Sequence, residues 1–119
     1  MIHLDTNFLI LVSGSAAGRS LQTWLSAGED LGTIAWSEFL CGPLTPQDAT
    51  LAQMLFAAPE PFIASDARKA AELFNVTGRR SRSLADCQIA AVAIRCGVSL
   101  ATGNVTDFSQ FQSHGLHLA

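Results

Sequence analysis

Four acidic residues of this chain stand at or near points where the sequence predicts that helices begin. They are Asp5, Glu38, Asp86 and Asp107. Asp5, Glu38 and Asp107 each follow a predicted strand, and the carboxyl ends of strands in an open parallel sheet share one edge, where ligands bind. We therefore expect these three carboxylates to lie close together. Asp86 precedes its strand, so it joins them only if its helix points its N-terminus toward that edge.

The chemistry that such a cluster favours is the binding of a divalent cation. Carboxylates gathered at a partly buried edge repel one another, and without a counter-charge some of them would have to take up protons. A cation removes that penalty, and a ligand set made only of oxygen favours Mg²⁺ or Mn²⁺ over zinc. Each acid also has a simpler explanation, because a carboxylate near a helix start can cap the helix or oppose its dipole. The segments Ser83–Asp86 and Asn104–Asp107 both have the spacing of a capping box.

The elements that must position these acids alternate between short apolar runs and helical segments. This alternation predicts a three-layer α/β/α fold with a central, mostly parallel sheet of four to five strands. With 119 residues, the chain fits one domain over residues 1–119. The predicted strands are Met1–Leu4, Leu31–Trp36, Pro61–Ala64, Val98–Ala101 and Leu116–Leu118. The predicted helices are Thr6–Val12, Ser20–Ala27, Glu38–Cys41, Thr45–Ala58, Ser65–Val76, Ser83–Ile94 and Asn104–Phe111.

The composition is poor in charge for a small protein. Charged residues make up 14% of the chain and apolar residues 49%, whereas about 25% charged is usual. We expect such a chain to hide apolar surface in an oligomer or against a partner. None of its apolar runs approaches the roughly 18 residues of a membrane span, and the N-terminus lacks the basic segment of a secretory signal. The expected location is the cytoplasm.

Several other chemistries find no support in the sequence. There is no GxxxxGK[ST], GxGxxG or GxSxG motif, which argues against P-loop, dinucleotide and serine-hydrolase sites. The three cysteines form no disulfide framework and no CxxC zinc motif. A phosphatase with an aspartyl nucleophile usually has a second Asp two residues after the first, but here Asn7 occupies that place.

A short basic segment gives an ambiguous signal for nucleic-acid binding. The net charge of −3 argues against a dedicated nucleic-acid binder, which would usually be basic. Arg79, Arg80 and Arg82 nevertheless crowd together beside Gly78. Arginines grouped in this way can hold a phosphate backbone, or they can simply be a solvated loop.

Four segments together resemble the motifs of a known family, the PIN domains. They are Leu4–Asn7, Trp36–Gly42, Asp86–Ala93 and Ala101–Phe108, whose letters read LDTN, WSEFLCG, DCQIAAVA and ATGNVTDF. Their order and spacing and the total length agree with that family, so the resemblance spans nearly the whole chain. Within the family, the chain most resembles the VapC-like toxins of type II toxin–antitoxin systems.

The resemblance implies a Mg²⁺- or Mn²⁺-dependent endoribonuclease that is often dimeric and is held inactive by a small antitoxin. It implies a catalytic site made of Asp5, Glu38, Asp86 and Asp107, of which Asp5, Asp86 and Asp107 hold the metal. It also assigns Thr6 and Asn104 as polar helpers beside that site. Gly103 departs from the pattern, because many relatives carry a basic residue there.

The leading hypothesis is hydrolysis of RNA phosphodiester bonds by metal-activated water. Arg79, Arg80 and Arg82 would contact RNA phosphates, which positions a strand without reading its sequence. Two alternatives stay open. One is an RNA-processing nuclease of the same fold that acts without an antitoxin. The other is a catalytically silent binding module whose acids only cap helices.

Overall fold

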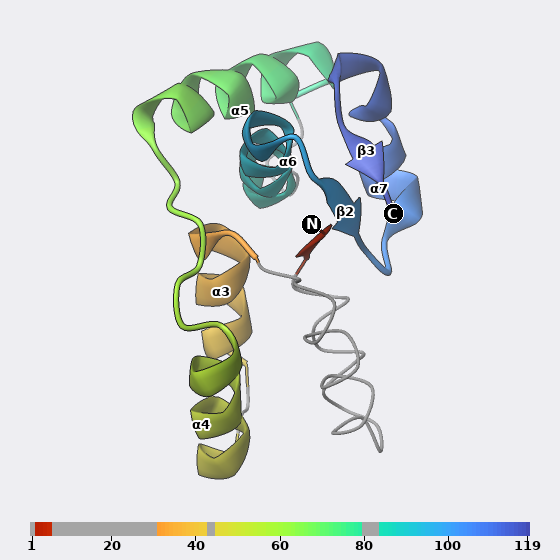
Figure 1. The fold of residues 1–119 in the computed structure, drawn as a ribbon. Coiled ribbons are helices and arrows are strands. Elements are labelled where there is room, and N and C mark those ends of the chain that lie inside the picture. Colours follow the sequence, from red (N-terminus) through yellow and green to blue (C-terminus); the bar gives the residue numbers. More distant parts are fainter. Residues whose placement is uncertain (1, 6–30, 43–44, 80–83) are drawn as a thin grey trace.

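The computed structural model describes residues 2–5, 31–42, 45–79 and 84–119, whose arrangement is shown in Figure 1. The elements in chain order are β1 (Ile2–Leu4), α3 (Thr33–Leu40), α4 (Pro46–Leu55), α5 (Ala64–Val76), α6 (Leu84–Cys96), β2 (Ser99–Ala101), α7 (Val105–Ser109), the 3₁₀ helix η2 (Gln112–His114) and β3 (His117–Leu118). The expected helices Thr6–Val12 and Ser20–Ala27, and the residues Thr6, Arg80 and Arg82, lie outside the described residues.

The sheet joins three short strands that are far apart in the chain. β2 lies between β1 and β3 and pairs in parallel with both. Leu4 stands opposite Ala101, so the residues that follow β1 and β2 emerge side by side at one edge. The prediction of an α/β fold with a parallel sheet is confirmed. The described part of the chain contains three strands, fewer than the four or five expected.

The expected strand Leu31–Trp36 is wrong, because most of it is helical. α3 begins at Thr33 and includes the predicted short helix Glu38–Cys41 up to Leu40. Ala35 and Phe39, four residues apart, are both buried on α3. That spacing puts them on one helical face, and burying this face outweighs the β-branched residues that favoured a strand.

The expected strand Pro61–Ala64 is also absent from the structure. What remains is an isolated parallel bridge between Gly32 and Glu60. Two hydrogen bonds support it: Glu60 N donates to Leu31 O at 2.9 Å, and Thr33 N donates to Glu60 O at 2.9 Å. The two segments therefore touch as neighbouring strands would, but helices begin too soon after the bridge for a ladder to grow.

Helices α3 and α4 are held together by an aromatic contact. The ring of Trp36 lies 5.9 Å from that of Phe39 and 6.0 Å from that of Phe56, which caps the end of α4. α4 itself starts as predicted. Thr45 Oγ1 accepts a hydrogen bond from Asp48 N at 3.1 Å, which satisfies one of the free N–H groups at the helix start.

α6 is the buried centre of the structure. Residues 89–93 are all buried, and α5 packs along it more extensively than any other described helix does. Gly97, with φ of 65°, then turns the chain directly into β2. The chain thus reverses at this turn, so the first turn of α6 lies toward the carboxyl ends of the strands. None of the described helices is long and apolar enough to cross a membrane.

Candidate functional site

Asp5 is held where β1 and β2 end side by side. It is only 2% exposed, and its N–H donates to Ala101 O at 3.0 Å, which continues the ladder one residue past β1. One of its carboxylate oxygens accepts a hydrogen bond of 2.5 Å from Thr102 Oγ1. A buried carboxylate needs such donors, because its charge has lost much of its contact with water. Thr102 therefore helps to fix the orientation of the Asp5 carboxylate.

Thr102 is a functional candidate that the sequence analysis missed. It directly follows β2, opposite the residue that directly follows β1. Its oxygen also accepts a hydrogen bond from Asn104 N at 2.9 Å, so the hydroxyl proton is directed toward Asp5. The signal was present in the sequence, since a hydroxyl residue at the carboxyl end of a predicted strand faces the same edge as the acid at the end of its neighbour.

Asp107 is oriented by Asn104 and does not form the predicted capping box. Asn104 is the N-cap of α7 but makes no capping hydrogen bond with its side chain. Instead, Asn104 Nδ2 donates to Asp107 Oδ2 at 2.7 Å. The Asp107 carboxylate remains exposed to solvent. The amide thus holds this carboxylate in place and leaves one of its oxygens accessible.

The negative charges of the other three acids contribute to a raised pKa of Asp86. It lies in the first turn of α6, and its pKa is raised from 3.8 to about 6. Burial is the largest cause, followed by the negative charges of Glu38, Asp107 and Asp5. A like charge raises a carboxyl pKa only when it is near. Glu38, Asp107 and Asp5 therefore lie near enough to Asp86 to act on it through their charge, and α6 supplies the orientation that the sequence left open.

Glu38 reaches this cluster from the middle of its helix. It is the sixth residue of α3, and no acidic residue lies in the first turn of that helix. The simpler explanation that Glu38 opposes the dipole at a helix start is therefore wrong. Its side chain is exposed, so Glu38 and Asp107 border the solvent while Asp5 lies beneath.

The donor set fits a divalent cation by its chemistry. All candidate ligands are carboxylate oxygens, the type that Mg²⁺ and Mn²⁺ prefer. The pKa of Asp86 is raised by burial and then by repulsion from the other three acids, and this repulsion is a penalty that a cation would relieve. Within the described ranges, no three His, Cys, Asp or Glu side chains are already grouped so that they could hold a metal ion. Binding of a divalent cation would therefore require the carboxylate side chains to move closer to one another.

Arg79 belongs to the turn that ends α5. Gly78 and Arg79 both have positive φ, 99° and 59°, and Arg79 N donates to Phe74 O at 2.9 Å. Residues other than glycine rarely adopt the left-handed region. The hydrogen bond from Arg79 N to the end of α5 holds Arg79 in this conformation. Arg79 is exposed, which leaves its guanidinium accessible to a phosphate.

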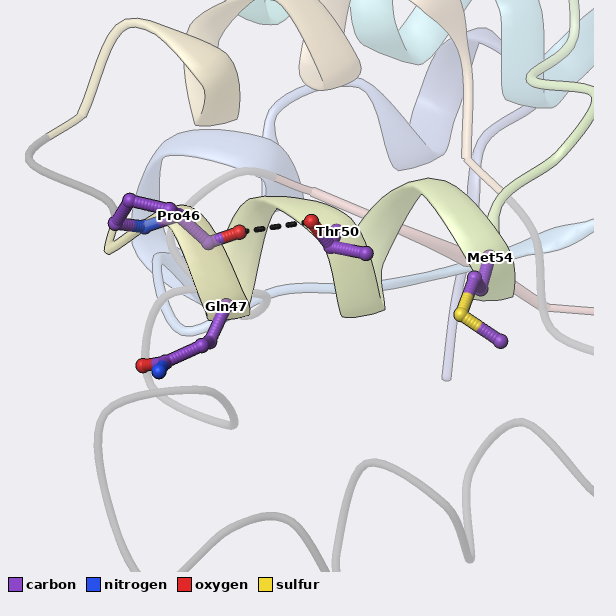
Figure 2. Close-up of a pocket in the computed structure, with 4 residues that line it drawn as sticks. All are labelled: Pro46, Gln47, Thr50 and Met54. Carbon is purple, nitrogen blue, oxygen red and sulfur yellow. Dashed lines mark hydrogen bonds between the residues drawn. The ribbon is translucent and has the colours of Figure 1, made fainter.

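A surface cavity of about 380 Å³ lies beside α4 and not at the carboxylates. Figure 2 shows Pro46, Gln47, Thr50 and Met54, which line it. Thr50 Oγ1 donates to Pro46 O at 2.9 Å within the helix. The lining residues in the described part of the chain carry no charge, so the cavity does not add a candidate catalytic group.

Comparisons with known proteins identify the family and support the fold. Residues 2–112 match the family described as the PIN domain. The structure of VapBC2 from Rickettsia felis, bound to a DNA fragment from its promoter, has a TM-score of 0.72 at 18% identity and covers 100% of this chain and 98% of that chain. DNA-bound VapBC from Salmonella typhimurium has a TM-score of 0.76 at 16% identity and covers 99% and 96%. FitAcB from Neisseria gonorrhoeae has a TM-score of 0.67 at 21% identity and covers 100% and 97%. At these identities the likeness establishes the fold. No curated protein matches the chain in sequence.

Proposed function

The chain belongs to the PIN-domain family, and on that premise we propose that it is a Mg²⁺- or Mn²⁺-dependent endoribonuclease, the toxin of a type II toxin–antitoxin pair. The observation that carries the proposal is the convergence of four acids: the pKa of Asp86 is raised to about 6 by its burial and then by the negative charges of the other three. The acids come from four separate segments of the chain. Helix caps would have no reason to converge on one another, whereas ligands of one cation would.

Asp5, Asp86 and Asp107 are the proposed metal ligands, and Glu38 completes the catalytic set. A cation held there would offset negative charge on the phosphate and make a nearby water more acidic. The protein's own contribution is to fix the ligands in advance. Thr102 and Asn104 each direct one carboxylate by a hydrogen bond, at 2.5 and 2.7 Å. Such partners typically tune metal affinity by about 10- to 100-fold.

Protons compete with the cation at Asp86. With a pKa of about 6 in the absence of metal, this carboxyl holds a proton below that pH and would have to lose it to serve as a metal ligand. The site therefore binds metal best above pH 6. The exposed Asp107 and Glu38 carboxylates keep the cluster open to an extended substrate, and the exposed Arg79 can contact an RNA phosphate.

An antitoxin and a second copy of the chain are the proposed partners. An acidic cluster attracts a basic segment, so an antitoxin Arg or Lys placed among the carboxylates would exclude the metal. The similar structures are described as VapBC and FitAcB, and this likeness supports an antitoxin as the protein partner. Apolar side chains that stand exposed, such as Met54 at 74%, support association with a further protein surface or a homodimer.

A catalytically silent binding module is the second candidate. It is favoured by the absence of a preformed metal-holding group among the described residues. A cleavage assay separates the two. Purified protein, freed of any antitoxin, is incubated with single-stranded and structured RNA in Mn²⁺, Mg²⁺ or EDTA.

Asp5→Asn is the test variant in this assay, and Asp48→Asn, which makes the same change at an exposed position on α4, is its matched control. The nuclease proposal predicts metal-dependent cleavage that is lost only in Asp5→Asn. Equal activity of wild type and Asp5→Asn, both shown to be folded, would contradict it.

A further inference from the structure

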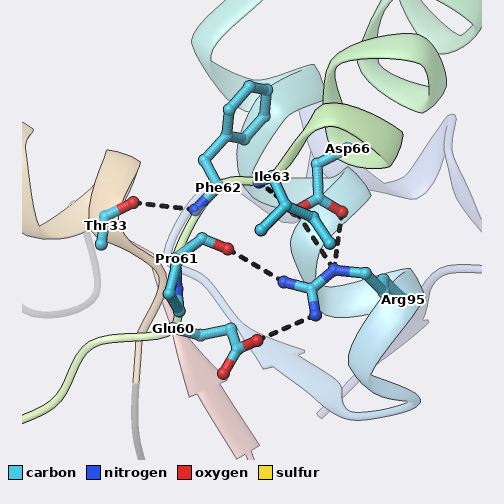
Figure 3. A network of polar contacts seen from close by, with 7 residues as sticks. All are labelled: Thr33, Glu60, Pro61, Phe62, Ile63, Asp66 and Arg95. Atoms are coloured by element: carbon cyan, nitrogen blue, oxygen red, sulfur yellow. Dashed lines mark hydrogen bonds and ion pairs between the residues drawn. The ribbon is translucent and has the colours of Figure 1, made fainter.

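Arg95 joins three segments at the end of α6 that faces away from the carboxylates. Figure 3 shows its guanidinium between an acidic residue on each side and a backbone carbonyl. Arg95 Nε donates to the two carboxylate oxygens of Asp66 at 2.9 and 3.1 Å. Nη1 lies 2.8 Å from Glu60 Oε1, and Nη2 donates to Pro61 O at 2.9 Å. We call these four residues the Arg95 anchor.

The anchor also reaches the start of α3. Phe62 N donates to Thr33 Oγ1 at 3.1 Å, next to the bridge that joins Gly32 to Glu60. α6 lies directly over this bridge, since a Cβ on Gly32 would stand 3.4 Å from Val92 Cγ1. The start of α3 and the last turns of α6 are therefore fastened to the same few residues.

Glu38 on α3 and Asp86 on α6 lie at equal distances along their helices from the point where Gly32 meets Val92. Glu38 lies six residues after Gly32, and Asp86 lies six residues before Val92. At 1.5 Å per residue, each arm is about 9 Å long. A tilt of about 10° at the fastened end would move the acid at the other end by roughly 1.5 Å. Catalytic ligands must be held within about 0.5 Å, so a small change at the anchor matters at the cluster.

We propose that Arg95 is a positioning residue that sets the separation of Asp86 from Glu38 by fixing α6 against the start of α3. It touches neither acid and acts only through the two helices. Asp66, 1% exposed, is part of this device because its buried carboxylate holds the guanidinium and also accepts from Ile63 N at 2.9 Å. The consequence for metal binding and cleavage rests on the function proposed above.

The test compares the wild type with a neutral variant that keeps the shape of the anchor. Arg95→Met alone would leave Asp66 buried and unpaired and would risk unfolding. The double variant Arg95→Met/Asp66→Asn removes both charges and leaves an amide oxygen for Ile63 N. Crystal structures of both proteins give the separation of the Asp86 and Glu38 carboxylates, and Mn²⁺ titration of folded protein gives the affinity.

We expect the separation to change by about 1 Å or more and the Mn²⁺ affinity to fall about tenfold, with kcat lowered and KM for RNA unchanged. Arg95→Lys, which keeps the charge but not the three-way contact, should recover only part of the affinity. Thr45→Ala is the control for lost stability, because it removes a helix cap on α4 that does not touch the anchor. It should leave the affinity unchanged.

A separation that stays within 0.5 Å of the wild-type value in the double variant would overturn the proposal. An affinity that falls equally in Thr45→Ala would do the same, because the effect would then follow stability and not position. If the wild type binds no Mn²⁺ and cuts no RNA, the proposed function fails. The crystallographic comparison would still decide whether Arg95 positions the two acids.

Discussion

Replacing Asp86 with Asn should make the metal-free protein more stable at neutral pH. Its folded-state pKa is raised from 3.8 to about 6, so the folded protein holds this proton more tightly than the unfolded chain does. The sign follows from linkage: the penalty is absent below pH 4, grows as the pH rises toward 6, and is fully present at pH 7. Each pKa unit corresponds to about 1.4 kcal/mol, which gives an upper bound of about 3 kcal/mol. Because Asp86 is only half-buried, we expect about 1–2 kcal/mol.

Urea denaturation in EDTA measures this difference directly. Asp86→Asn should unfold at higher urea than the wild type at pH 7, and the gap should shrink at pH 4.5. Asp48→Asn, an exposed acid outside the cluster, should change stability by less than about 0.5 kcal/mol. Mn²⁺ at 100 times its Kd should then stabilise the wild type by about 2.7 kcal/mol but not Asp86→Asn. A variant that is no more stable than the wild type in EDTA at pH 7 would refute the electrostatic reasoning.

Three further predictions concern the hydrogen bonds and protons of the structure. Thr102→Val should weaken Mn²⁺ binding about tenfold in calorimetric titration, because Asp5 loses an orienting donor. Thr102→Ser keeps the hydroxyl and should bind Mn²⁺ as the wild type does. Equal affinities of the two variants would contradict this role of Thr102. Mn²⁺ affinity should fall up to tenfold per pH unit below 6 and level off above it, as Asp86 takes up its proton; a flat profile from pH 5 to 7 would speak against this. Thr45→Ala should lower stability by about 1 kcal/mol through the lost cap of α4, and an unchanged urea midpoint would argue against that cap.

The sequence was sufficient to predict the elements whose signals are local. The cap of α4 by Thr45, the apolar helix that carries Asp86 and the strand that ends at Ala101 all lie within a residue or two of their predicted places. These signals are short-range, since a cap, a glycine turn or an apolar run is readable from neighbouring residues. The alternation of strands and helices then indicated a shared edge for the acids.

The features that the sequence could not predict depend on contacts between distant segments. The start of α3 at Thr33 follows from burying Ala35 and Phe39, which no local propensity reveals. The pairing of Arg95 with Asp66 joins residues 29 apart in the chain. The orientation of α6, on which the position of Asp86 depends, likewise became clear only from the packed helix and its turn into β2.

Anomalous diffraction from crystals soaked in Mn²⁺ tests the central claim most directly, because it locates the ion without reference to activity. The account predicts a peak among the four acids, with carboxylate oxygens of Asp5 and Asp86 about 2.1 Å away, and no such peak in crystals of Asp86→Asn. A well-ordered crystal with no peak at this edge, or with a peak only elsewhere on the chain, would contradict the claim that these carboxylates form a metal site.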